Sequence, residues 1–204
     1  ALRPDQYQSV LELIDLLNET DVPGFVQGSA GTGKTVVAIF LIKLLVTPIE
    51  ELLDIDEVRD KEEPSIERKL IIRLKELFPK PKVALVIPVT PLRKTLKRVF
   101  RGVKGLNAGM VVGPSEVIGK GYDILIVDES HRLRQRKNRS GYGSFDANNK
   151  KLGLGDDGTE LDWILASSKK KIFFYDRGQS VKPSDVPEGR FLALKPFAKV
   201  IRLQ

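Results

Sequence analysis

One stretch of the sequence carries the residue types and spacing of a phosphate-binding loop. Residues 28–35, Gly-Ser-Ala-Gly-Thr-Gly-Lys-Thr, fit the pattern G-x-x-x-x-G-K-[ST] at every fixed position. The glycines let backbone N–H groups turn toward an anion without a Cβ clash, and a helix that starts here presents its positive end to the same anion. We expect the Lys34 ammonium to reach the β- and γ-phosphates and the Thr35 hydroxyl to bind Mg²⁺. The predicted nucleotide-binding residues are Gly28, Ser29, Ala30, Gly31, Thr32, Gly33, Lys34 and Thr35.

Two adjacent carboxylates form a second chemical feature. Asp128 and Glu129 directly follow residues 123–127, an apolar run with the length of a buried strand. Ligands of α/β sheets bind at the carboxyl ends of strands, so we expect Asp128 near the phosphate loop, where it holds Mg²⁺ directly or through water. Glu129 is then placed to orient and deprotonate an attacking water. The alternative is a solvated acidic turn; His131 is either structural or couples the site to a partner.

Buried strands alternate with helices along the chain, which predicts one α/β domain over residues 1–204 with a mostly parallel sheet and helices on both faces. Periodicity and apolar runs predict helices over 4–19, 34–46, 66–78 and 92–100, and strands over 24–28, 83–87, 110–112, 123–127, 171–175 and 199–203. Residues 132–158 have little periodicity and are too long for an ordinary connection. We expect them to be a mobile or partner-binding insertion.

Composition excludes several classes of site. The sequence has no cysteine and a single histidine, which excludes disulfides, a cysteine nucleophile, thiolate zinc sites and multi-histidine metal sites. It has no run of 18 apolar residues and no apolar signal segment at its start, so we expect no membrane span and a cytoplasmic location. The chain starts at Ala1 rather than at a methionine, which favours a piece of a longer protein.

The net charge of +7, from 34 Lys and Arg against 27 Asp and Glu, favours polyanionic partners. The basic excess is concentrated in residues 93–104 and 132–151, whereas residues 50–63 are acidic. Phosphate contacts by Arg and Lys would bind nucleic acid, and Tyr142 and Phe145 within the second segment offer stacking surfaces. The alternative is that both segments are solvated faces, and Trp163 is expected in the core.

The order of these motifs resembles the first motor domain of superfamily 1 helicases. The phosphate loop comes first, Asp-Glu-Ser-His at 128–131 follows, and Asp176-Arg-Gly-Gln179 comes third. Residues 174–185, with 162–165 before them, are similar to the Schlafen-type (group 3) helicase-like domains. The resemblance implies a RecA-like P-loop NTPase fold, ATP and Mg²⁺ as cofactors, single-stranded DNA or RNA as partner, and a second RecA-like lobe beyond this chain.

The same resemblance assigns roles to further residues. Leu2-Arg-Pro-Asp-Gln6 looks like the Q motif, which implies that Gln6, or less readily Gln8, reads the adenine edge. Residues 88–93 are similar to motif Ia, which implies strand contacts by Thr90, Pro91 and Arg93. Asp176-x-x-Gln179 is similar to motif III, whose glutamine senses the γ-phosphate and links it to the strand. Residues 199–204 resemble the strand that leads into motif IV.

Three functions are compatible with these residues. The first is the ATP-hydrolysing lobe of a helicase or translocase, with Lys34, Glu129 and Gln179 as catalytic residues and with His131 and Asp176 coupling ATP to the strand. The second is an ATP-dependent regulatory switch that binds nucleic acid or protein without translocating. The third, a small-metabolite kinase, is disfavoured because it needs neither the motif III residues nor the Q motif. The chain stops before motif IV and its arginine fingers, so we expect weak hydrolysis.

Overall fold

The core of the molecule is a six-stranded sheet whose neighbouring strands are all parallel. The structure is a computed structural model that describes residues 2–53, 65–137, 141–176, 178–179 and 182–203; residues 54–63 of the predicted acidic segment lie outside them. The strands, in the spatial order β3-β2-β4-β5-β1-β6, are β1 (Gly24–Gln27), β2 (Val83–Val86), β3 (Val111–Val112), β4 (Tyr122–Val127), β5 (Ser168–Tyr175) and β6 (Lys199–Arg202). The predicted parallel sheet is therefore confirmed.

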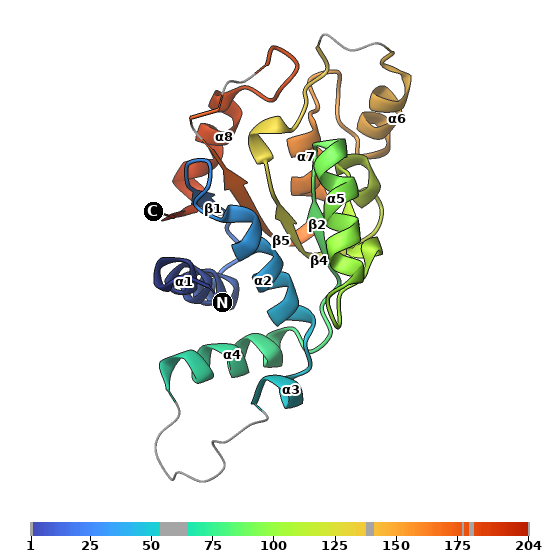
Figure 1. Ribbon diagram of the computed structural model, residues 1–204. Coiled ribbons are helices and arrows are strands. Elements are labelled where there is room, and N and C mark those ends of the chain that lie inside the picture. The colour runs from blue at the N-terminus through green and yellow to red at the C-terminus, as the bar shows by residue number, and fades with distance from the viewer. Residues whose placement is uncertain (1, 54–64, 138–140, 177, 180–181, 204) are drawn as a thin grey trace.

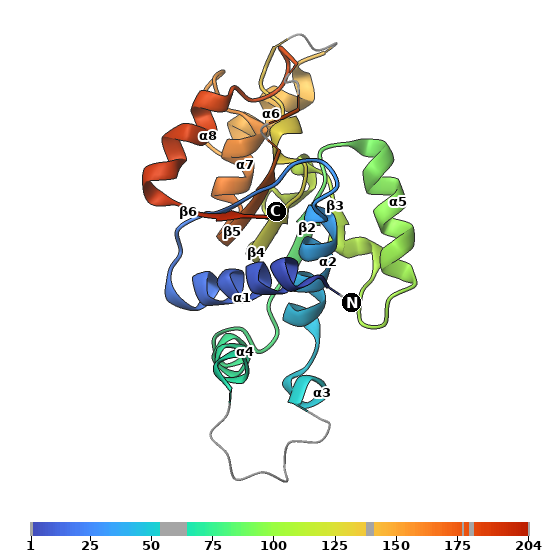
Figure 2. The same ribbon diagram turned by 60° about the vertical axis from the view of Figure 1, so that its left-hand side comes forward.

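Helices cover both faces of this sheet (Figure 1). They are α1 (Pro4–Glu19), α2 (Lys34–Val46), α3 (Ile49–Leu53), α4 (Ile66–Leu77), α5 (Thr90–Arg101), α6 (Gly143–Lys151), α7 (Glu160–Ala166) and α8 (Glu188–Leu194). Side chains alternate across a strand, and on β5 Ile172 and Phe174 enter the core under α1, α2 and α5, whereas Phe173 and Tyr175 enter the core under α7 and α8. Figure 1 and Figure 2, two views that differ by a turn about the vertical axis, both place α4 and α6 at opposite ends of the domain.

The order of the strands decides which loops meet. β5 lies between β1 and β4, with Gln27 opposite Tyr175 and Phe173 opposite Val127. The residues that follow these three strands are the phosphate loop after β1, Asp176 after β5 and Asp128 after β4. All three therefore emerge side by side at the carboxyl edge of the sheet, where ligands of α/β proteins bind.

The predicted helices and strands agree with the observed ones to within a few residues, and α1 and α2 have the predicted bounds. The helix expected over 92–100 is longer, because Pro91 occupies its first turn, where a missing N–H costs no hydrogen bond. Four short helices, α3, α6, α7 and α8, were not expected. None of the four has an apolar repeat long enough to be seen in the sequence.

Part of the 132–158 segment packs into the body of the domain. Phe145 of α6 is buried against Trp163 of α7, with ring centroids 4.5 Å apart, and the Trp163 indole N–H donates to Asn149 at 2.7 Å. The expected core position of Trp163 is confirmed. Phe145, expected as a stacking surface, is 1% exposed, so a base cannot stack on it in this conformation. Among the described residues, no helix has the length and apolar character needed to cross a membrane.

Candidate nucleotide site and adjoining groove

The phosphate loop has the backbone that its glycines predict. Gly31 and Gly33 have φ of +83° and +86°, a region that other residues enter only at a cost. Gly33 ends the loop and α2 starts at Lys34, so the first turn of that helix faces the loop. A Cβ on Gly33 would also lie 2.2 Å from Nε2 of Gln6, which shows how closely α1 supports the loop.

Gln6 lies behind the loop rather than free in solvent. Its Nε2 donates to the Thr32 carbonyl at 3.0 Å, and its Oε1 accepts from the Arg3 backbone N–H at 3.0 Å. The Arg3 guanidinium donates to the same Thr32 carbonyl at 2.8 Å. The N-terminal segment that resembles a Q motif therefore holds the phosphate loop in place from behind.

Lys34 is held over the start of the loop. Its Nζ donates to the carbonyls of Gly28 and Ser29 at 2.7 and 2.8 Å, and it lies 3.6 Å from Oδ2 of Asp176. Lys34 and Asp176 are 7% and 3% exposed, so this pair of opposite charges sits in a region of reduced dielectric. The ammonium is thus near the loop and already partnered by three oxygen atoms.

The side chains of Thr35, on α2, and Asp128, after β4, meet at the carboxyl edge of the sheet. The Thr35 hydroxyl donates to Oδ2 of Asp128 at 2.5 Å, although the two residues are 93 positions apart. Asp128 is fully buried, and this burial raises the pKa of its carboxyl. Hydrogen bonds from the Thr35 hydroxyl and from the Glu129 backbone N–H act in the opposite direction. Among the described residues, no group of three or more His, Asp or Glu side chains could hold a metal ion.

Glu129 occupies a strained turn at the end of β4. It has φ of +52° and is the one non-glycine residue of the described chain with positive φ. Such strain persists where the surroundings over-determine it, which is typical of functional sites. The Oε2 atom of Glu129 lies 3.1 Å from Nε2 of His131. The hydrogen bond with His131 lowers the pKa of Glu129, against the effect of partial burial.

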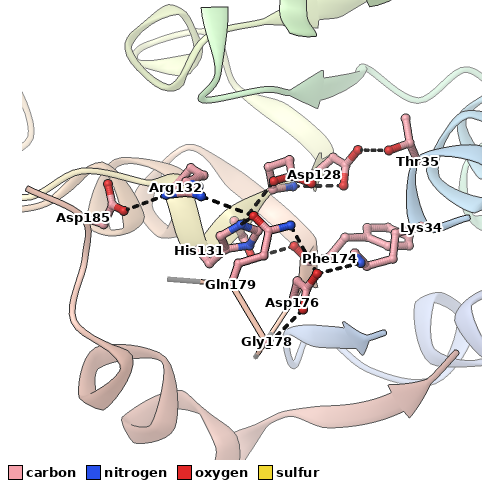
Figure 3. A network of polar contacts seen from close by, with 12 residues as sticks. Lys34, Thr35, Asp128, His131, Arg132, Phe174, Asp176, Gly178, Gln179 and Asp185 are labelled. Atoms are coloured by element: carbon pink, nitrogen blue, oxygen red, sulfur yellow. Dashed lines mark hydrogen bonds and ion pairs between the residues drawn. The ribbon is translucent and has the colours of Figure 1, made fainter. Parts of the chain in front are cut away.

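A continuous polar network joins the lysine to the histidine (Figure 3). Asp176 accepts from the Gln179 side-chain amide at 3.2 Å and from the Gly178 backbone N–H at 2.9 Å. Oε1 of Gln179 lies 3.0 Å from Nε2 of His131. Burial raises the pKa of Asp176, but the two hydrogen bonds and the nearby charges, that of Lys34 first, together outweigh it and hold this pKa below its ordinary value.

His131 sits between two acceptors. Its Nε2 faces Oε2 of Glu129 and Oε1 of Gln179, so this nitrogen carries a hydrogen. Its Nδ1 is buried and has no hydrogen-bond partner among the described residues, and its ring is 5.8 Å from that of Tyr175 in an edge-on arrangement. The structure therefore brings all five predicted catalytic and coupling residues, Lys34, Glu129, His131, Asp176 and Gln179, into one network.

A groove of about 450 Å³ lies beside this network. It is lined by residues of three segments of the chain, namely Pro88, Val89, Thr90, Pro91, Arg132, Arg134, Lys182, Ser184 and Asp185. Thr90 and Pro91, two of the three expected strand contacts, are in its wall. The third, Arg93, points back into the protein, where its guanidinium donates to the Ile87 carbonyl at 2.7 Å and to the Thr90 hydroxyl at 3.2 Å.

Sequence reasoning placed Arg134 only within the basic segment 132–151, and it did not single out Lys182 or Arg202. Arg134 and Lys182 line the groove from loops that follow β4 and β5. Arg202 lies beside Gln27 in the sheet and lines a hollow of about 290 Å³ with Gly28 and Ser29. Strand order brings these residues to the site, and the sequence alone does not contain that order.

A further cavity, of about 620 Å³, lies far from the nucleotide loop, between the end of α2 and the end of α4. Its lining is largely apolar and includes Lys75, whose Nζ donates to the Leu45 carbonyl at 2.6 Å. Burial lowers the pKa of Lys75 to about 8. None of the predicted site residues lines this cavity, so it is separate from the nucleotide site.

Comparison with known proteins gives a family and several distant structures. A family model described as "Schlafen group 3, DNA/RNA helicase domain" matches residues 23–199. Among solved structures, Pif1 from a Bacteroides species in complex with ADP-AlF4 has 13% identity and a TM-score of 0.43, and the alignment covers 100% of this chain and 42% of that one. Pif1 helicase from Candida albicans has 16% identity, a TM-score of 0.42, and coverages of 100% and 40%.

The replication initiator DnaA, bound to AMPPCP and single-stranded DNA, has 14% identity, a TM-score of 0.38, and coverages of 97% and 45%. This chain therefore spans less than half the length of each of these proteins, and a search of curated proteins found no match. The sheet order and the family match together confirm the expected RecA-like class of the fold. Because the family model covers most of the sequence, the chain belongs to the Schlafen group 3 DNA/RNA helicase domain family.

Proposed function

We propose that this domain binds Mg-ATP at residues 28–35, hydrolyses it slowly, and couples this reaction to a single strand of DNA or RNA. The observation that carries the proposal is the convergence of residues from three separate strand ends. Lys34, Asp176, Gln179, His131 and Glu129 form one chain of contacts beside the Thr35–Asp128 hydrogen bond. A fold maintained only for packing has no need for this buried polar chain, because each buried polar group must be satisfied at a cost.

The proposed cation is Mg²⁺, and the donors near the loop fit it. Mg²⁺ prefers oxygen ligands and is usually held by one or two protein groups together with phosphates and waters. The Thr35 hydroxyl and the Asp128 carboxylate are such groups, 2.5 Å apart at the start of α2. When bound, Mg²⁺ neutralises charge on the β- and γ-phosphates. Asp128 would hold it directly or through water.

Glu129 is the proposed general base. Its lowered pKa keeps the carboxylate ionised at neutral pH, and this ionised form accepts a proton from water. In the present arrangement His131 hydrogen-bonds to that carboxylate. Gln179 accepts from the same histidine nitrogen and donates to Asp176 beside Lys34, so it is placed to sense whether a γ-phosphate occupies the loop.

The groove is the proposed strand site. Its wall combines Thr90 and Pro91 with Arg132, Arg134 and Lys182, and the cations outnumber the single carboxylate, Asp185. Positive side chains around a groove bind the sugar–phosphate backbone without reading sequence. Arg93 would act indirectly, because its guanidinium fixes the turn that presents Thr90.

A regulatory switch is the second candidate function. The contact of His131 with Glu129 ties the proposed base to Gln179, the proposed γ-phosphate sensor, which suits a domain that signals its nucleotide state. A motor needs a second RecA-like lobe closing on the same nucleotide, and we propose that lobe as a partner of this domain. Processive turnover driven by a strand supports the motor, whereas nucleotide-dependent strand affinity without it supports the switch.

The test is an ATPase measurement with and without single-stranded DNA and RNA, with Lys34→Ala as the blank. We expect a low basal rate, stimulation by at least one of the strands, and no rate above background in the variant. A rate that Lys34→Ala leaves unchanged would show that hydrolysis occurs elsewhere. A rate that ignores both strands would remove nucleic acid from the proposal.

A further inference from the structure

Arg132 touches both the nucleotide network and the groove. One end of its guanidinium, Nη2, donates to Oε1 of Gln179 at 3.3 Å, and the other, Nη1, lies 3.5 Å from Oδ2 of Asp185 (Figure 3). Gln179 belongs to the chain of contacts that leads to Lys34, whereas Asp185 lines the groove. A single planar side chain therefore spans the two sites.

Backbone hydrogen bonds hold the groove side of this contact in place. Backbone hydrogen bonds pair Gln135 with Ser184 at 2.9 Å and Val186 with Leu133 at 2.7 Å, so the two groove loops are fixed to each other. Asp185 is 4% exposed, and its carboxylate also accepts from the Lys182 backbone N–H at 2.9 Å. Asp185 is held in place by these contacts, so a change in the Arg132–Asp185 contact requires movement of the Arg132 side chain.

Arg134 differs from Arg132 in the way a matched control should. Its backbone is fixed at the start of α7, because its N–H donates to the Glu160 carboxylate at 2.9 Å and its carbonyl accepts from the Glu160 N–H at 3.0 Å. Both of these contacts lead to α7 rather than to Gln179. The Arg134 side chain is exposed and lines the same groove. Arg134 can therefore contribute charge to the groove without a link to the nucleotide network.

We propose that Arg132 is the positioning residue through which a phosphodiester in the groove and a nucleotide in the loop affect each other. This inference rests on the proposed function. A strand phosphate is an anion that competes with Asp185 for the Arg132 guanidinium, and Arg forms paired hydrogen bonds with phosphate readily. Rotation of Arg132 toward the strand removes one of the two donors from Oε1 of Gln179.

The consequence reaches the proposed base. Once Arg132 leaves, His131 Nε2 is the remaining donor to Gln179 Oε1, so its hydrogen shifts toward Gln179 and away from Glu129. Glu129 is then free to accept a hydrogen from water. In the reverse direction, a γ-phosphate that engages Gln179 releases Arg132 toward the groove. Binding linkage requires that each ligand change the affinity of the other by the same factor.

The test measures strand affinity in two nucleotide states. Fluorescence anisotropy of labelled oligo-dT and oligo-U gives the dissociation constant of the full chain with Mg²⁺ and either a non-hydrolysable ATP analogue or no nucleotide. The ratio of the two constants is the coupling factor, which we expect to be about 5- to 100-fold in the wild-type chain. Arg132→Ala and Arg132→Lys are the test variants. Arg134→Ala is the groove control, and Arg73→Ala, on α4, is a control for loss of an exposed arginine.

The variants have distinct expected results. Arg134→Ala weakens strand binding equally in both nucleotide states, so the coupling factor is unchanged. It also reduces the slope of log affinity against log salt concentration by about one, the value expected for the loss of one phosphate contact. Arg132→Ala brings the factor close to one, and Arg132→Lys, which keeps the charge but not the fork, leaves it well below the wild-type value. Arg73→Ala changes nothing. Circular dichroism and thermal unfolding establish that each variant is folded.

Two results would overturn the inference, and they differ. If the wild-type chain binds strand with a coupling factor above one and Arg132→Ala keeps that factor, Arg132 is only a structural ion-pair partner and the proposed function stands. If the wild-type chain binds neither oligonucleotide in either nucleotide state, the proposed function itself fails and the inference fails with it.

Discussion

Substituting Gly33 by alanine should damage the loop in a way that its neighbour Gly31 does not. Both glycines have φ near +85°, which an L-residue adopts at a cost of about 1–2 kcal/mol. A Cβ at position 31 meets no atom within 4 Å, whereas at position 33 it would lie 2.2 Å from Nε2 of Gln6. Gln6 must then move, and it loses its buried hydrogen bond to the Thr32 carbonyl.

The size of the difference follows from these contacts. Gly31→Ala is expected to lower the free energy of unfolding by about 1–2 kcal/mol from backbone strain alone. Gly33→Ala adds about 1–3 kcal/mol for a buried amide left without its partner. A change of 1 kcal/mol shifts the melting temperature of a domain of this size by about 2–4 °C. Gly33→Ala should therefore melt several degrees below Gly31→Ala.

Thermal unfolding followed by circular dichroism, together with urea unfolding at 25 °C, gives both free energies. The double variant Gly33→Ala/Gln6→Ala removes the side chain that the new methyl would meet, so its loss should be smaller than the sum of the two single losses. Equal stabilities of Gly31→Ala and Gly33→Ala would show that α1 does not support the loop through Gln6.

Three further outcomes are expected. Glu129→Gln should keep Mg-ATP binding, measured by calorimetry, and stop phosphate release; hydrolysis at the wild-type rate would remove Glu129 as the base. Asp128→Asn should weaken Mg-nucleotide binding but stabilise the empty protein at neutral pH, because burial raises the pKa of this carboxyl and its charged form is costly. The contribution of Asp128 to the free energy of unfolding therefore falls as the pH rises from the pKa of this carboxyl in the unfolded chain through its higher pKa in the folded chain. Urea unfolding in which the free energy of unfolding has the same pH slope in the wild-type chain and in Asp128→Asn would contradict this. Burial lowers the pKa of Lys75 to about 8, so between about pH 8 and 10.5 this residue has lost its proton in the folded state but keeps it in the unfolded state. The free energy of unfolding should therefore rise with pH over that range, and Lys75→Met should abolish the rise. Identical pH slopes of the free energy of unfolding in the two proteins would count against the burial of Lys75.

The sequence identified the parts of the site that depend on local pattern. The phosphate loop, its strand and its helix are contiguous, so their geometry follows from residues 24–46 alone. Asp128 was predicted because it follows an apolar strand, and Asp176 and Gln179 were predicted from motif order. The parallel sheet brings the three together because β5 lies between β1 and β4. The sequence could not supply the direction of the Arg93 side chain, since that depends on the Ile87 carbonyl at the end of another element.

The helices that follow β4, α6 and α7, could not be predicted from the sequence. α6 has no apolar repeat, and its burial depends on Phe145 meeting Trp163 and on Asn149 meeting the indole N–H. One local signal was present for α7, since Thr159 and Asp162 form a capping box at its start. The groove combines segments that follow β2, β4 and β5, so its charge balance becomes visible only when the strand order is known.

Coupling between ATP hydrolysis at the phosphate loop and a strand in the groove can be measured directly. The quantity is the steady-state rate of phosphate release, titrated with single-stranded DNA and RNA, for the wild-type chain, Lys34→Ala and Glu129→Gln. We expect a slow basal rate that rises with at least one strand, and no strand-dependent rate in either variant. A wild-type rate that stays flat across both titrations, or a stimulated rate that survives in Glu129→Gln, would contradict the proposed coupling.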